Sequence, residues 1–277
     1  MENATILYLV NSTKESLEEI KESISLLKRN FLDEFPYTVT IFKEIDFDTN
    51  WEIEILEIYS KCQFFLVDFK IPEFNLHLEI PEFTPHPTHG TGPIAWGHPG
   101  FNMGYRHMCR FMAGGMFRNE NLLKYEWYWR LDTDSFILSK IHFDVFSKMK
   151  DGGFLYGFNN IQDDNPKVVE GLFENSEKYM IDRSIEKKNN ADHPKMYYTN
   201  FEIGKVDWFL SSGYMDYFDY IDSIGGIYTK RWGDAPIRYI GINYLMDRRN
   251  ILDFSAIIDY RHGCHREFEK SLTYSGK

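Results

Sequence analysis

The first third of the chain alternates strand and helix patterns, and this alternation limits the fold more than any other feature. Residues 4–10 form an apolar, β-branched run that is typical of a buried strand. Over residues 17–31, apolar side chains recur at helical intervals. Two further apolar runs, residues 37–42 and 64–69, indicate strands. We therefore predict an α/β fold.

The size and charge of the chain narrow its class. It has 277 residues, of which 43% are hydrophobic and 17% aromatic, so it can bury a large core. No linker divides it, and we predict one domain over residues 1–277. The net charge of −11 argues against a nucleic-acid partner, because such binders present a surplus of Lys and Arg to phosphates. A phosphorylated ligand would need positive charge supplied locally.

Neither the cysteines nor the apolar runs indicate a secreted or membrane-spanning chain. Cys62, Cys109 and Cys264 have no CxxC spacing, so no disulfide framework or cysteine zinc site is predicted. No run reaches the roughly 18 to 20 consecutive apolar residues that a bilayer span requires. The chain as given is therefore predicted to be soluble.

Two aspartates, Asp132 and Asp134, follow an aromatic strand pattern at residues 125–131. Ligands of α/β folds bind near the carboxyl ends of strands, and two carboxylates one residue apart can hold a divalent cation that grips a diphosphate. The same D-x-D spacing occurs at Asp46 and Asp48, in what reads as a surface loop. Spacing alone therefore leaves a capped turn open as the alternative.

Four more residues are candidates for the same site, each with a structural alternative. Glu202 interrupts an apolar run just before a helical pattern, where a carboxylate also favours a helix N-terminus. Asp234 precedes Ala-Pro, a sequence typical of a helix N-cap. His262 and His265 follow an apolar run, and a histidine there can reach a cation held by the D-x-D pair, although a single histidine is more often a surface or packed residue than a ligand.

These pieces occur together in one known family. In order along the chain, its blocks are "GYRHMCRF", "YEWYWRLDTD", "TNFEI", "GGIYTKRWGDAP" and "YRH". They resemble blocks of the fungal α-1,2-mannosyltransferases of glycosyltransferase family 15, and the likeness runs over nearly the whole chain. The resemblance implies a GT-A-type α/β fold for nucleotide sugars, with a mixed central sheet flanked by helices. It also implies GDP-mannose as donor, Mn²⁺, and transfer that retains the anomeric configuration.

The resemblance assigns the binding residues position by position. Asp132 and Asp134 match the acidic pair of the family's Glu-Pro-Asp, which binds the donor through the metal. His262 best matches the metal-binding histidine near the C-terminus. Tyr105, in the first block, matches a tyrosine near the donor nucleotide. The resemblance therefore predicts Asp132, Asp134 and His262 as metal ligands and Tyr105 as a donor contact.

The resemblance also assigns the catalytic carboxylates. Glu202 in "TNFEI" matches the family's candidate nucleophile, and Asp234 is the aspartate of "RWGDAP". The chain departs from the family pattern in lacking a membrane anchor and stem, in Asp-Thr for Glu-Pro, and in "YRH" for "YHH". A shorter Asp132 would set the cation differently from a Glu, and a changed pocket could accept another sugar.

Together these observations predict a metal-dependent retaining glycosyltransferase. It would move mannose from GDP-mannose to a hydroxyl of a glycan or glycoprotein acceptor. The alternatives are the same fold with another nucleotide sugar, and a catalytically degenerate member that binds a glycan or nucleotide. The predicted location is cytoplasmic for the chain as given, or the Golgi lumen if this is a trimmed catalytic domain.

Overall fold

The computed structural model describes residues 1–75, 77–80 and 103–263. Cys264 and His265 fall outside this part. The strands of the described part are β1 (Ala4–Val10), β2 (Thr38–Lys43), β3 (Cys62–Leu66), β4 (Trp127–Leu131), β5 (Ser135–Ile137), β6 (Tyr156–Phe158), β7 (Ile161–Asp163), β8 (Lys195–Tyr197), β9 (Phe201–Lys205), β10 (Ile251–Asp253) and β11 (Tyr260–His262).

The α-helices of the described part are α1 (Lys14–Leu27), α2 (Thr49–Ile58), α3 (Met103–Ala113), α4 (Glu120–Leu123), α5 (Val145–Asp151), α6 (Leu172–Asp182), α7 (Val206–Ser211), α8 (Tyr214–Ile224), α9 (Gly226–Thr229) and α10 (Asp234–Leu245). A π-helical turn, Lys28–Leu32, continues α1. Within the described ranges, no helix combines the length and the apolar character needed to cross a membrane.

Seven strands form one mixed sheet in the order β10-β6-β9-β4-β1-β2-β3. Strand β9 runs antiparallel to its neighbours β4 and β6, whereas the other neighbouring pairs are parallel. The carboxyl ends of β1, β2 and β4 therefore meet the amino end of β9 at one edge of the sheet. The predicted α/β class with a mixed central sheet is confirmed.

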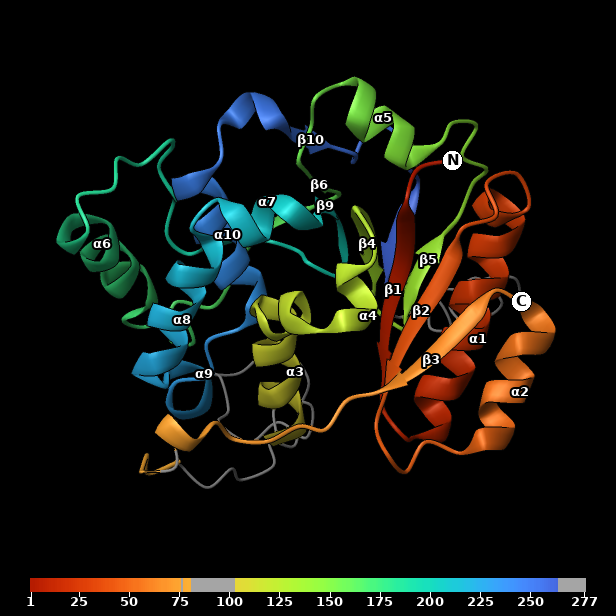
Figure 1. Cartoon of the computed structure of the whole chain (residues 1–277), viewed down its shortest axis with the longest axis horizontal. Helices are drawn as coiled ribbons and strands as arrows, with labels where there is room; N and C mark the ends of the chain where they lie inside the picture. Colours follow the sequence, from red (N-terminus) through yellow and green to blue (C-terminus); the bar gives the residue numbers. More distant parts are fainter. Residues whose placement is uncertain (76, 81–102, 264–277) are drawn as a thin grey trace, which may run out of the picture.

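Helices cover both faces of this sheet (Figure 1). Helices α1 and α2 lie on one side, and α3, α8 and α10 lie on the other. A hydrophobic core lies on each face of the sheet, and alternate side chains of a strand pack into one core or the other, as expected from the two-residue period of a strand. Ile6 and Tyr8 of β1 pack with the α1 side, whereas Leu7 packs with the core that contains α3, α8 and α10.

The sequence patterns located most elements and misplaced a few. Helix α1 begins after Thr13, whose hydroxyl accepts a hydrogen bond from the Ser16 N–H at 3.2 Å. The strand predicted at residues 64–69 lies two residues earlier, as β3. Helices α2 and α6 were not predicted. Residues 206–224 contain two helices, α7 and α8, because Gly213 lies between them with a positive φ of 85°.

Candidate active site

The carboxyl end of β4 carries the first predicted site residues. The chain turns after Leu131, and the Ser135 N–H donates to the Asp132 carbonyl at 3.0 Å. Strand β5 follows and pairs with β11, placing Ser135 opposite His262. The N–H of Gly263 also donates to the Asp134 carbonyl at 3.0 Å. This small two-stranded sheet therefore brings the C-terminal histidine to the D-x-D turn, although 128 positions separate it from Asp134 in the sequence.

Asp134 and His262 form a close pair. The Nε2 atom of His262 lies 3.0 Å from Oδ1 of Asp134 and 4.0 Å from Oδ2 of Asp132. Burial disfavours the charged imidazole, but the hydrogen bond and charge of Asp134 prevail and raise the pKa of His262. On its other side, Nδ1 of His262 lies 3.1 Å from the Tyr198 hydroxyl. The imidazole is therefore held at both nitrogens.

Asp132 faces a buried arginine. Oδ1 of Asp132 accepts a hydrogen bond from Nε of Arg130 at 3.2 Å and lies 3.1 Å from Nη2 of the same guanidinium. Arg130 is 2% exposed, and its remaining nitrogen donates to Asp234 Oδ2 at 2.5 Å. One guanidinium thus links the end of β4 to the start of α10 and offsets part of the negative charge of the two carboxylates.

Asp234 is the first residue of α10, but its side chain does not cap the helix. Gly233 occupies the N-cap position, and Asp234 Oδ2 accepts from Arg130 and from the Thr199 hydroxyl at 2.8 Å. Burial opposes ionisation, yet the charge and hydrogen bonds of Arg130 and the bond from Thr199 lower the pKa of Asp234. The N-cap alternative is wrong for this residue, which is an ionised carboxylate turned toward the site.

These residues line a cavity of about 330 Å³, named here the D-x-D cavity. Its wall includes the end of β4, the residues just before β9 and the loop before α10. Predicted and additional residues meet there: Tyr105, Met108, Arg130, Asp132, Asp164, Met196, Tyr198, Thr199, Asn200, Arg231, Gly233, Asp234, Ala235, Pro236 and His262. Four of the six predicted site residues, Tyr105, Asp132, Asp234 and His262, therefore share one cavity, and Asp134 contacts His262 next to it.

Glu202 is the exception. It lies on β9 opposite Arg130 and is 0% exposed, and it is not among the residues that line the D-x-D cavity. Its two oxygens accept from the Tyr128 hydroxyl at 3.2 Å, the Tyr156 hydroxyl at 3.0 Å and Nε of Arg238 at 3.1 Å. The helix-start alternative does not describe this residue, because it lies within a central strand.

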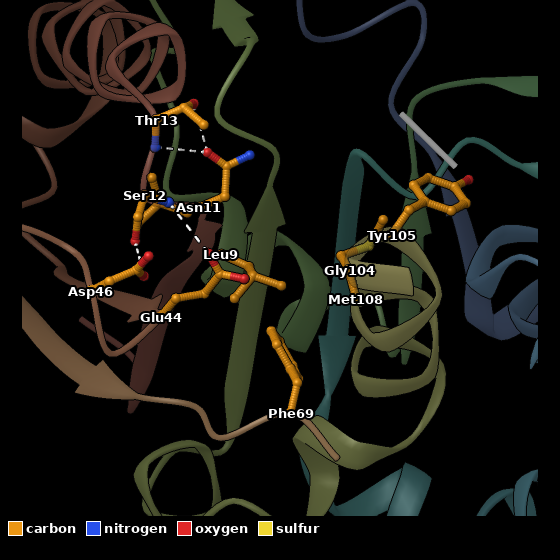
Figure 2. Close-up of a pocket in the computed structure, with 11 residues that line it drawn as sticks. Leu9, Asn11, Ser12, Thr13, Glu44, Asp46, Phe69, Gly104, Tyr105 and Met108 are labelled. Atoms are coloured by element: carbon orange, nitrogen blue, oxygen red, sulfur yellow. Dashed lines mark hydrogen bonds between the residues drawn. The ribbon is translucent and has the colours of Figure 1, made fainter. Parts of the chain in front are cut away.

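A second cavity, of about 460 Å³, adjoins the first and is named here the β1–β2 cavity. Figure 2 shows the turn after β1 and the turn after β2 on one side and α3 on the other. Ser12 donates its hydroxyl to Asp46 at 2.5 Å and its N–H to Glu44 at 3.4 Å. Tyr105 and Met108 line both cavities. The two cavities therefore share part of their walls, on α3.

The aspartates of the other D-x-D pattern have separate roles. Asp46 lines the β1–β2 cavity, whereas Asp48 caps α2 by accepting from the Asn50 N–H at 2.8 Å. Asp46 is exposed in the turn between β2 and α2, as predicted for a surface loop, and this turn also forms part of the cavity wall. Its position after β2, a parallel neighbour of β1, is the signal that sequence reasoning passed over.

A divalent cation fits the donor atoms of the Asp134–His262 pair. Two adjacent ligands of an octahedral ion, each about 2.1 Å from it, are roughly 3 Å apart, close to the separation observed. Carboxylate oxygen and imidazole nitrogen suit Mn²⁺. No group of three or more His, Cys, Asp or Glu side chains within the described residues is arranged to hold an ion. The third candidate, Asp132, is turned toward Arg130, so this pair would leave other ligand positions to the substrate.

Sequence reasoning missed three residues of the site. Arg130 and Arg231 line the D-x-D cavity, and Tyr198 fixes His262. Arg130 is visible in the sequence as a charge inside an apolar strand, the same signal that singled out Glu202. Arg231 and Tyr198 belong to irregular segments, where no periodicity indicates which side chains turn inward.

Comparison with known proteins gives the family. A family model described as Glycolipid 2-alpha-mannosyltransferase matches residues 1–269. The chain belongs to this family. Among its relatives, the probable mannosyltransferase KTR3 of Saccharomyces cerevisiae is 36% identical over 170 residues, which is 57% of this chain and 42% of KTR3. The O-glycoside alpha-1,2-mannosyltransferase omh1 of Schizosaccharomyces pombe is 29% identical over 276 residues, 92% of this chain and 68% of omh1.

Solved structures of mannosyltransferases share the fold. Core-mannan synthase A (CmsA/Ktr4) of Aspergillus fumigatus, in a Mn/GDP form, matches with a TM-score of 0.79 at 24% identity. The match covers 95% of this chain and 75% of that one. Ktr4p of Saccharomyces cerevisiae in complex with GDP matches with a TM-score of 0.78, also at 24% identity, over 94% of this chain and 71% of that one. The predicted GT-A-type fold is confirmed.

Proposed function

We propose that this mannosyltransferase-family chain transfers mannose, with retention, from GDP-mannose to a hydroxyl of a glycan or glycoprotein. The observation that carries the proposal is the Asp134–His262 pair beside the D-x-D cavity, at the carboxyl end of a sheet strand. Solved neighbours with this fold hold GDP, and one of them holds Mn as well. The pair and the fold together favour a nucleotide diphosphate held through a divalent cation.

The two cavities fit the two ends of such a donor. Glu44 and Asp46 line the β1–β2 cavity, and none of its described lining residues is Lys or Arg, so it disfavours phosphate. The D-x-D cavity has Arg130 and Arg231 in its wall. We therefore place the nucleoside in the β1–β2 cavity, the diphosphate near the Asp134–His262 pair, and the sugar in the D-x-D cavity. Tyr105, which lines both, would contact the nucleotide where it passes from one to the other.

In the proposed reaction, the bond from C1 of the sugar to the diphosphate breaks and a bond from C1 to the acceptor oxygen forms. The acceptor hydroxyl gives up its proton, which the leaving diphosphate takes up. A cation on Asp134 and His262 would supply positive charge to the leaving diphosphate. Arg130 holds both Asp132 and Asp234 through hydrogen bonds, so these carboxylates are oriented before the donor binds.

Glu202 stays our predicted nucleophile or oxocarbenium stabiliser, and the structure adds a requirement. Because both of its oxygens are bonded and it does not line the cavity, direct contact with the sugar requires Arg238 or one tyrosine to release it. Of the two proposed catalytic carboxylates, Asp234 lines the cavity and Glu202 does not.

A donor-hydrolysis screen tests the proposal. With Mn²⁺ present, we expect release of GDP from GDP-mannose to exceed product release from UDP-sugars, and chelation to abolish it. Asp134→Asn should lose most of the activity because it removes a metal-binding charge. Asp48→Asn is the matched control, since Asn also caps helices and this side chain does not line the two cavities. Full activity in EDTA, or preference for another nucleotide sugar, would contradict the proposal.

Two further proposals concern the chain as a whole. We propose that residues 1–277 act as one catalytic domain, supported by the single seven-stranded sheet to which both the N-terminal and C-terminal parts of the described chain contribute. The Golgi lumen and the cytoplasm stay alternative predictions for its location.

A further inference from the structure

Arg231 has an unusual backbone in the wall of the D-x-D cavity. Its φ is 66°, in the left-handed region that side chains other than Gly, Asn and Asp rarely adopt. Such strain persists only where the surroundings impose it, and it is concentrated at functional sites. A strained arginine that lines the candidate active site therefore requires a functional explanation.

The backbone on either side of Arg231 is pinned. The N–H groups of Lys230 and Trp232 donate to the Gly226 carbonyl at 2.9 and 3.1 Å. The Trp232 indole is buried and donates to the Glu170 carbonyl at 2.9 Å, and a Cβ at Gly226 would collide with its ring. The segment is thus held in the conformation that places the guanidinium 5.6 Å from the centre of the Tyr105 ring.

The D-x-D cavity has an excess of acidic side chains, so a negatively charged ligand would need additional positive charge in its wall. Asp132, Asp164 and Asp234 all line the D-x-D cavity, and a diphosphate would add further negative charge. The charge of Arg130 is already shared between Asp132 and Asp234. Arg231 lines the same cavity and contacts Tyr105, where the two cavities meet. In a donor with its nucleoside in one cavity and its sugar in the other, the diphosphate that joins them would pass this junction on its way to the Asp134–His262 pair.

We propose that Arg231 binds the diphosphate of the nucleotide-sugar donor, as a fixed positive charge additional to the cation of the Asp134–His262 pair. This inference rests on the proposed function. A guanidinium suits the role because its planar donors match two phosphate oxygens at once and it stays charged in a partly buried site. Arg231 would also supply the local positive charge that a phosphorylated ligand needs in a protein with a net charge of −11.

Equilibrium binding with Mn²⁺ present separates a phosphate contact from a structural role. For Arg231→Gln we expect GDP affinity to fall about 10- to 100-fold, the scale of a lost charged hydrogen bond, while guanosine affinity is unchanged. GDP affinity should fall less in Arg231→Lys than in Arg231→Gln, because lysine keeps the positive charge but lacks the two parallel N–H donors of the guanidinium. Arg249→Gln is the control, since Arg249 is exposed and pairs with Asp247; it should bind GDP as the wild type does.

Thermal stability gives an independent readout. In Arg231→Gly the positive φ is no longer strained, so the melting temperature should stay the same or rise while GDP affinity still falls. GDP affinity within about twofold of the wild type in Arg231→Gln would overturn the inference, as would an equal loss of guanosine affinity. If the wild-type protein binds no GDP with Mn²⁺, the proposed function fails and this inference with it.

Discussion

Two acidic regions near the candidate active site differ in how their charges are surrounded. Glu202 lies in what we name the buried network, with Arg238, Tyr128 and Tyr156, where every oxygen of the carboxylate is bonded. The Asp134–His262 pair is partly exposed, at 28% and 23% of the side chains, and its two groups face each other across 3.0 Å. A compensated charge in the interior holds a structure together, whereas an open pair can exchange its proton for a cation. The difference teaches that burial alone does not mark the binding site.

The largest effect should come from breaking the buried network. Arg238→Met leaves Glu202 as a buried charge without its cation, so we expect the free energy of unfolding to fall by about 3 to 5 kcal/mol. Denaturant unfolding measures this. Arg118→Gln, which breaks a half-exposed pair with Asp219, should cost less than about 1 kcal/mol. Equal losses in the two variants would show that burial does not distinguish these ion pairs.

The next effect sharpens the comparison at Glu202 itself. Glu202→Gln keeps the shape and removes the charge, and we expect kcat to fall at least ~10²-fold while donor binding survives, as for the loss of one stabiliser of the transition state. Steady-state kinetics with GDP-mannose measures it.

A double variant separates catalysis from folding. In Glu202→Gln/Arg238→Met both buried charges are gone, so stability should recover relative to Arg238→Met. If Glu202 acts on the sugar, kcat stays low in the double variant. Recovery of kcat together with stability would mean that Glu202 serves only as the partner of Arg238.

A smaller effect is expected at the support of the open pair. Tyr198→Phe removes the hydroxyl next to Nδ1 of His262, and we expect Mn²⁺ affinity to fall about 10-fold, as for other groups that orient a metal-binding histidine. Titrating activity or binding with Mn²⁺ measures it. Tyr244→Phe removes a hydroxyl bonded to Glu177, outside both cavities, and should leave Mn²⁺ affinity unchanged. Equal Mn²⁺ affinities in the wild type and in Tyr198→Phe would contradict the claim that Tyr198 orients His262 for metal binding.

The sequence predicted the fold and the open pair better than the contacts around them. Continuous apolar runs located β1 and β4, which are buried on both faces, and helical periodicity located α1, which buries one face. The match to the family blocks predicted that His262 and Asp134 bind the same metal ion, and the two side chains are in contact. No local sequence pattern predicts this contact. The link from Arg130 to Asp132 and Asp234 was not predicted, since it depends on how β4 meets α10. Helix α2 was missed because its only fully buried residue is Ile55, so little apolar periodicity marks it.

The central claim is that the Asp134–His262 pair holds the cation that holds the donor, and GDP binding measured by calorimetry tests it most directly. In the wild type, replacing EDTA by Mn²⁺ should raise GDP affinity at least about 10-fold, whereas in Asp134→Asn the two conditions should give nearly the same weak affinity. GDP binding in the wild type that does not change on adding EDTA, or an Asp134→Asn variant with the full response to Mn²⁺, would contradict the account.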